Sequence, residues 1–115
     1  MIHGAHVITY SKDSDADRAF FRDVLKYKSV DAGHGWQIFT LPPAEAAVHR
    51  SDTHDSHELF LMCDDVRAFI ASMQEYQVPC TPVAEQRWGS MTRLTLPGGG
   101  KLGVYQPKHA SVEVA

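Results

Sequence analysis

The chain has 115 residues, of which 43% are hydrophobic, and its 11 basic and 14 acidic side chains leave a formal charge of −3 at pH 7. This length suits one compact domain, whose core lies near the lower limit for independent stability. No run of basic residues is present to follow a phosphate backbone, which argues against nucleic acid as a partner. The apolar runs are far shorter than the roughly 20 residues that cross a bilayer, which argues against a membrane protein.

The N-terminal residues and the cysteines indicate a compartment. The opening MIHGAHVITY leads directly into a strand pattern and lacks the charged, apolar and cleavage regions of a signal peptide. Cys63 and Cys80 are too few for a disulfide framework, and we expect both to be buried thiols. These features predict a soluble protein of the reducing cytoplasm.

The first half of the chain is expected to contain a strand, a helix and three more strands. Segment His6–Ser11 is rich in β-branched and aromatic residues, which predicts a strand. Asp13 suits a helix N-cap, and apolar residues recur every four positions from Ala16 to about Leu25, which predicts an amphipathic helix. Three strands are predicted to follow, over Lys26–Val30, Trp36–Leu41 and Ala44–His49.

The same order of elements starts again after the polar stretch Arg50–Ser56. His57–Cys63 is predicted to be a strand, and Asp64 and Asp65 then cap a helix with an apolar face. The remaining predicted elements are a loop or short edge strand between Pro79 and Pro82, and strands over Gly89–Leu96 and Lys101–Gln106.

The two halves repeat one another at a nearly constant interval. The interval from His6 to His57 equals that from Asp13 to Asp64, and a Leu-Pro pair ends the third strand of each half. Such a repeat predicts a duplicated βαβββ unit. We therefore expect one α+β domain over residues 1–115, with modules at about 4–50 and 56–108. Its two βαβββ modules would form one curved, mixed eight-stranded sheet with the helices outside.

Three stretches resemble a known superfamily: AHVITYSKDSDADRAFFRDVL, HELFLMCDDVRAFI and WGSMTRLTLPGGGKLGVYQPKH. Together they cover nearly the whole chain, and they resemble the vicinal oxygen chelate proteins, which include glyoxalase I, extradiol dioxygenases and the fosfomycin- and bleomycin-resistance proteins. Lys26 stands where that pattern usually has glycine. The resemblance implies the duplicated fold described above, and it leaves activity open because one fold serves several chemistries.

The resemblance also implies positions for metal ligands. In the metal-using members, ligands come from the starts of the two first strands, which match His6 and His57, and from a glutamate on the last strand. Gly103 occupies the glutamate position and has no side chain to offer. Two imidazoles suit Fe, Mn, Zn or Ni, but they need further ligands beside them. The alternative is a pair of strand-initial histidines that are exposed or bonded to backbone.

Strand alternation predicts which residues would surround these positions. Ile8, Tyr10, Leu59 and Leu61 are expected on the walls of the same cavity as the two histidines. At Gly103, the missing side chain would leave room for water, for Tyr105 or for an oxygen atom of the ligand.

A further group of residues suits an apolar pocket with one cation. The group consists of Trp36, Trp88, Met91, Arg93 and Tyr105, and it would fit a small aromatic or carboxylated ligand. The alternatives are a core position for Trp36, a loop anchor for Trp88, and for Arg93 either solvent or a carboxylate across an interface.

Three functions are compatible with these features. The first is a small-molecule-binding protein without a metal, whose cavity is completed by a homodimer. The second is a divalent-metal-dependent dioxygenase, lyase or isomerase that uses His6 and His57, in which a metal would bind two vicinal oxygens of its substrate. The third is a structural or regulatory module with a filled cavity. The missing acid at Gly103 favours the first.

Overall fold

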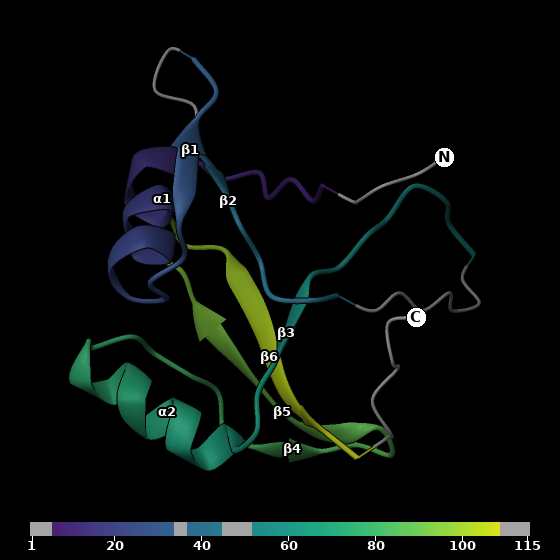
Figure 1. Cartoon of the computed structure of the whole chain (residues 1–115). Coiled ribbons are helices and arrows are strands. Elements are labelled where there is room, and N and C mark those ends of the chain that lie inside the picture. The colour runs from purple at the N-terminus through teal and green to yellow at the C-terminus, as the bar shows by residue number, and fades with distance from the viewer. Residues whose placement is uncertain (1–5, 34–36, 45–51, 109–115) are drawn as a thin grey trace.

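The computed structural model describes residues 6–33, 37–44 and 52–108. Within these ranges the chain forms two helices and six strands (Figure 1). In chain order the elements are α1 (Ser14–Asp23), β1 (Ser29–Asp31), β2 (Gln37–Phe39), β3 (Phe60–Met62), α2 (Val66–Glu75), β4 (Ala84–Glu85), β5 (Gly89–Thr95) and β6 (Lys101–Pro107). Neither helix is long and apolar enough to span a membrane.

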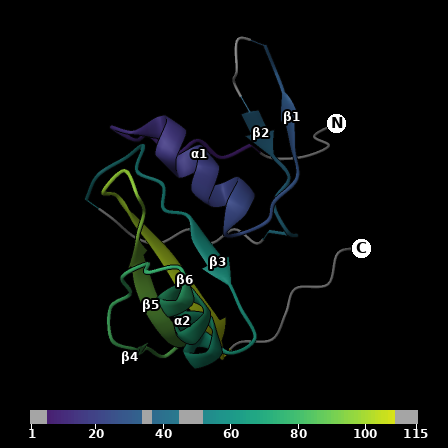
Figure 2. The same ribbon diagram turned by 90° about the vertical axis from the view of Figure 1, so that its left-hand side faces the viewer.

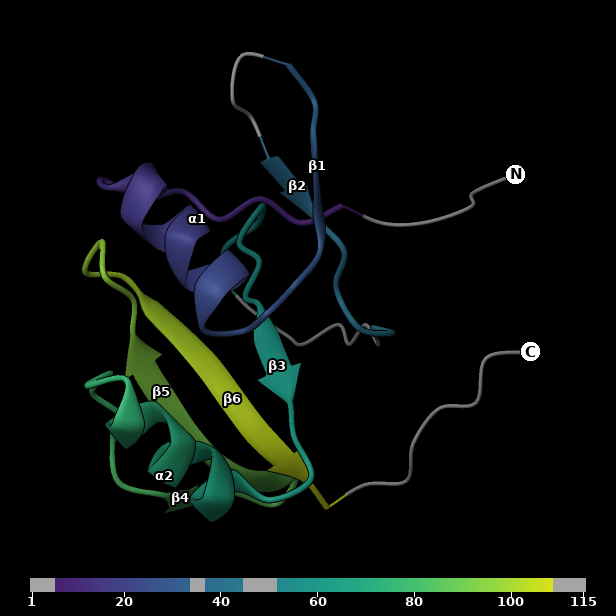
Figure 3. The same ribbon diagram turned by 60° about the vertical axis from the view of Figure 1, so that its left-hand side comes forward.

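The second half forms the predicted βαβββ module. Its four strands have the order β3-β6-β5-β4, with β3 parallel to β6 and the other neighbours antiparallel. Helix α2 covers one face of β5 and β6 (Figure 3). The Asp65 carboxylate accepts hydrogen bonds from the N–H groups of Arg67 and Ala68, both at 3.1 Å, and so caps α2 as predicted. Between Pro79 and Pro82, where a loop or short edge strand was predicted, Cys80 forms an isolated β-bridge with Leu94, and the edge strand β4 comes only after Pro82.

The first half forms a helix and a two-stranded hairpin. The Asp13 carboxylate accepts the Ala16 N–H at 3.2 Å and caps α1. Strands β1 and β2 pair antiparallel beside α1 (Figure 2), and the Phe39 ring lies 5.5 Å from that of Phe21. Val30 and Ile38 face each other across the hairpin, on the side opposite Phe39, and both are exposed.

The eight-stranded sheet is only partly present among the described residues, which form sheets of two and four strands. Residues 6–11 contain no strand, contrary to our prediction. In the second half, β3 obtains its hydrogen bonds from β6. The equivalent partner of residues 6–11 is the strand predicted at Ala44–His49, which, apart from Ala44, lies outside the described residues.

Both helices end in the same unusual backbone conformation. Lys26 after α1 and Gln77 after α2 have φ values of 62° and 60°, in the left-handed region that favours glycine. The two residues are separated by the same interval as His6 and His57, so the repeat extends to the helix ends. The conformation of Lys26 also excludes it from the strand predicted over Lys26–Val30, since an extended strand cannot include a left-handed residue; the strand begins at Ser29.

One hydrophobic core joins the two halves. Phe20 of α1 packs in the same cluster as Met73 of α2, and Leu94, Leu96, Leu102 and Val104 complete it. A polar contact reinforces this junction: the Gly98 N–H donates to an Asp17 carboxylate oxygen at 2.7 Å, and Asp17 is buried. Helix α1 is therefore held at the end of the sheet where β5 turns into β6 (Figure 3).

Candidate ligand-binding face

The sheet of the second half has one face that no helix of this module covers. Side chains alternate along each strand, and Leu94, Leu102 and Val104 point into the core with α2. The intervening residues share the opposite face, and their pairing places Phe60 beside Gly103 and Met91 beside Tyr105. We call this surface the helix-free face; it carries Phe60, Met62, Met91, Arg93, Gly103 and Tyr105.

Three aromatic rings cluster on the helix-free face. Trp88, which directly precedes β5, lies 5.9 Å from Phe60 and 5.1 Å from Tyr105 between ring centroids, and Phe60 lies 6.0 Å from Tyr105. All three pairs meet edge to face, at angles of 74° to 88°. Trp88 remains 38% exposed and the neighbouring Met62 40% exposed. The cluster therefore presents aromatic and apolar surface to the outside.

Gly103 lies directly under one of these rings. A Cβ atom built on Gly103 would overlap the ring atoms Cδ1 and Cε1 of Phe60. The Phe60 ring thus occupies the volume that a side chain at this position would need. This corrects the expectation that Gly103 leaves room for water or for an oxygen atom of the ligand.

Arg93 places a positive charge beside the rings. Its guanidinium carbon lies 5.2 Å from the centroid of the Phe60 ring, a cation–π contact. The guanidinium also lies 3.6 Å from an Oε atom of Glu58. This distance exceeds that of a normal hydrogen bond. Arg93 therefore pairs with a carboxylate of its own chain, where we had considered solvent or a neighbouring subunit.

The structure brings together three of the five residues predicted to line a pocket. Trp88, Arg93 and Tyr105 all surround Phe60. Met91 lies on the same face but is buried. Trp36 lies outside the described residues.

Known proteins resemble this chain in structure. No protein-family model matches the sequence, and no curated protein matches it. Solved structures do match. TnmS3, an antibiotic binding protein from Streptomyces sp. CB03234, is 22% identical with a TM-score of 0.61, over 94% of this chain and 100% of that chain. Lactoylglutathione lyase from Agrobacterium tumefaciens is 19% identical with a TM-score of 0.64, over 90% and 92%. The fosfomycin resistance protein FosX from Listeria monocytogenes is 12% identical with a TM-score of 0.65, over 94% and 94%.

The chain has the vicinal oxygen chelate fold. This confirms the fold that the resemblance implied, while the eight-stranded sheet is present only in part among the described residues. At these identities the likeness concerns the fold, because one fold can carry unrelated functions.

The described residues do not fit the metal site that the vicinal oxygen chelate fold implies. His6 and His57 are both exposed and lie outside the strands. Within residues 6–33, 37–44 and 52–108, no three His, Cys, Asp or Glu side chains are grouped to hold a metal ion. The third ligand position is Gly103, over which the Phe60 ring lies. That His6 and His57 share a cavity stays a prediction.

The predicted cavity walls were partly wrong. Leu59 and Leu61 pack against the hydrophobic core instead of facing Gly103. Our alternation counted from His57, whereas β3 begins only at Phe60 and places Phe60 and Met62 on the face of Gly103. Phe60 is therefore the central residue of the site, and the sequence analysis did not identify it.

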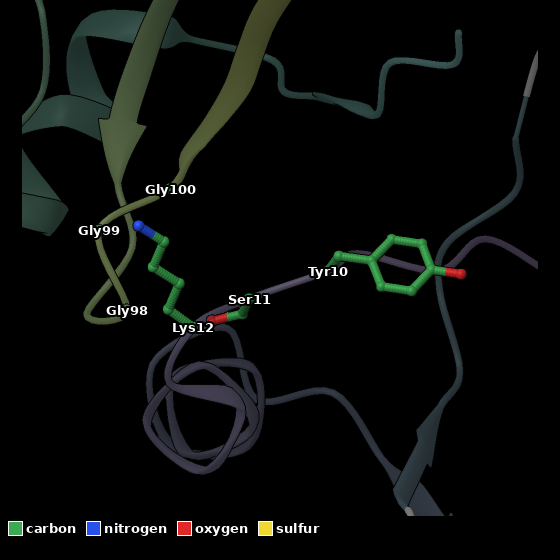
Figure 4. A pocket seen from close by; sticks show the side chains of 6 residues that line it. All are labelled: Tyr10, Ser11, Lys12, Gly98, Gly99 and Gly100. Carbon is green, nitrogen blue, oxygen red and sulfur yellow. The ribbon is translucent and has the colours of Figure 1, made fainter. Parts of the chain in front are cut away.

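A hollow lies at the junction of the two halves, away from the helix-free face. It has a volume of about 380 Å³ and is lined by Tyr10, Ser11, Lys12 and the turn Gly98–Gly100. Figure 4 shows the Lys12 side chain reaching toward Gly99 and Gly100, whereas Tyr10 points away from the turn. The hollow therefore offers mainly one cation, the Ser11 hydroxyl and backbone groups.

The cysteines offer no nucleophile. Burial raises the pKa of the Cys63 thiol, and the nearby charges of Asp64 and Asp65 raise it further against an opposing backbone hydrogen bond. Burial likewise raises the pKa of the Cys80 thiol. Because the thiolate is the reactive form, both residues are poor candidates for catalysis.

Proposed function

We propose that this chain is a small-molecule-binding protein that holds its ligand on the helix-free face without a metal ion. The observation that carries the proposal is the position of the Phe60 ring, which covers Gly103 where metal-using proteins of this fold place an acid. The same ring builds an aromatic surface with Trp88 and Tyr105, the kind of lining that binds apolar ligands. A similar structure, TnmS3, is described as an antibiotic binding protein, which supports the proposal.

We further propose that a second copy of the chain completes the cavity. Both halves expose apolar side chains on the side away from their own helix: Val30 and Ile38 in the hairpin, and Met62 and Trp88 in the larger sheet. Strand β3 ends the order of its sheet, so one of its edges has no strand partner among the described residues. Exposed apolar faces and open edges favour association, and symmetric dimers are its commonest form.

Light scattering is expected to give the mass of a homodimer at micromolar concentration. Replacing both Val30 and Ile38 with Lys should lower that mass to a monomer, because two buried charges would have no partners in the interface. The matched control is Tyr76→Lys, an exposed aromatic residue at the end of α2, which should remain dimeric. A wild-type monomer at this concentration would contradict the dimer.

The competing function is a divalent-metal-dependent enzyme that uses His6 and His57. One of the similar structures is a lactoylglutathione lyase, which supports this second candidate. The geometry favours binding, since the described part of the chain supplies no third ligand.

We also propose a cytoplasmic location, which the two free thiols support.

A ligand titration followed by two-dimensional amide NMR tests the binding function. With the neutral probe indole-3-acetamide, we expect the resonances of Met62, Trp88 and Tyr105 to shift. Trp88→Ala should weaken binding about tenfold, or ~1.4 kcal/mol, because it removes the exposed ring of the cluster. Tyr76→Ala should leave the affinity unchanged. Shifts that cluster away from the helix-free face, or full affinity in Trp88→Ala, would contradict the proposal.

A further inference from the structure

Building on the proposed function, we propose that the ligand is a planar aromatic compound with an anionic group, and that Arg93 binds this group by exchanging it for Glu58. The ring of the ligand would lie against Trp88 and Phe60. Its anionic group, of which a carboxylate is the simplest example, would take the place of the Glu58 carboxylate at the guanidinium.

The aromatic part of the ligand is inferred from the ring cluster. Phe60 and Tyr105 support Trp88 edge-on, at 5.9 and 5.1 Å between centroids, so the indole is held in place while part of it stays exposed. A rigid aromatic surface loses little conformational freedom when it binds a flat partner. Met62, which lies beside Tyr105 in the sheet and is also exposed, adds a polarisable contact to this face.

The anionic part is inferred from the state of Arg93. Its side chain is 41% exposed, and its ion pair with Glu58 is long at 3.6 Å, with the Glu58 side chain 69% exposed. Exposed ion pairs of this kind contribute little to stability. The planar fork of a guanidinium binds a carboxylate best through two parallel hydrogen bonds. A ligand carboxylate held beside the guanidinium by its own ring can make these bonds, and the loose pair with Glu58 costs little to break.

The charges around the rings favour an anion over a cation. On β6, Lys101 lies two residues before Gly103 and so on the same face, where its amine donates to the Thr95 hydroxyl at 2.6 Å. Among the described residues of β5, β6 and the segment that leads into β3, two cations therefore accompany one carboxylate, Glu58, on this face, in a chain whose overall charge is −3. A cationic ligand would have to displace Arg93 from the Phe60 ring, to which the guanidinium already binds.

Three probes of nearly equal shape test the inference: indole-3-acetate, indole-3-acetamide and tryptamine, which are anionic, neutral and cationic at pH 7. In the same NMR titration, we expect indole-3-acetate to bind at least tenfold more tightly than the amide, and tryptamine to bind most weakly. Glu58→Gln should increase the affinity for indole-3-acetate severalfold and leave the amide unchanged, because it removes the competing carboxylate. Arg93→Gln should abolish the preference for the anion.

Matched variants keep the outcome clear. Arg67 of α2 is another exposed and loosely paired arginine, 3.7 Å from Glu85 of β4. Arg67→Gln should retain the preference for the anion. If Arg93→Gln does not fold, Arg93→Lys keeps the charge without the planar guanidinium and should reduce the preference for the anion. Equal affinity for acetate and amide would overturn the inference and leave the binding function standing. If none of the probes shifts resonances of the helix-free face, the binding function itself fails.

Discussion

Gly103→Glu is expected to destabilise the fold strongly instead of restoring a metal ligand. Even a Cβ atom at this position overlaps the Phe60 ring, so Gly103→Ala alone should lower the free energy of unfolding by about 1–3 kcal/mol, the usual cost of overpacking. Glutamate should cost more, because its carboxylate would be forced against an aromatic ring in a buried part of the sheet. Urea unfolding measures both effects.

The Phe60 ring provides the control for this prediction. Phe60→Ala removes the obstacle, so the double variant Gly103→Ala with Phe60→Ala should cost clearly less than the sum of the two single variants, by about 1 kcal/mol or more. Gly100→Ala, with no heavy atom within 4 Å of the added Cβ, should stay within about 0.5 kcal/mol of the wild type. If Gly103→Ala is as harmless as Gly100→Ala, the Phe60 ring does not occupy this position.

Leu94→Ala is expected to lower the free energy of unfolding by about 2–5 kcal/mol. Leu94 is fully buried, and it shares one cluster with Phe20 of the first half and Met73 of the second. We propose that this cluster makes the two modules one domain, so the variant should still unfold in a single transition at a lower urea concentration.

The control for the core is Tyr76→Ala, an exposed residue at the end of α2, which should cost well under 1 kcal/mol. Two separate transitions in Leu94→Ala or in the wild type, followed by circular dichroism and tryptophan fluorescence, would show that the modules fold independently. Independent unfolding of the two modules would refute the shared core.

The elements with strong local signals were predictable from the sequence. Asp65 caps α2, and the repeat of helix and strands after residue 56 corresponds to α2, β5 and β6. The strand predicted over His6–Ser11 shows the limit of local signals. Its residues have high strand propensity, but a strand forms only when a partner supplies its hydrogen bonds.

The site was predictable only in part, for the same reason. The composition of the predicted pocket put Arg93 with Tyr105, and the register of β5 against β6 places both on one face; that they line a pocket stays a prediction. Phe60 was missed because its position depends on the parallel register between β3 and β6, which are about 40 residues apart. The resemblance to metal-using proteins drew attention to what Gly103 lacks. The structure adds that a neighbouring strand fills the space.

Titration of the metal-free protein tests the central claim most directly. The protein is purified without a nickel column, dialysed against a chelator and titrated with indole-3-acetate by amide NMR, alone and then with added Fe, Mn, Zn or Ni. We predict shifts on the helix-free face around Trp88 and Tyr105, with the same affinity whether or not a metal is present. Binding that requires a stoichiometric metal ion, and that is lost in His6→Ala or His57→Ala, would contradict a metal-free site and favour the enzyme.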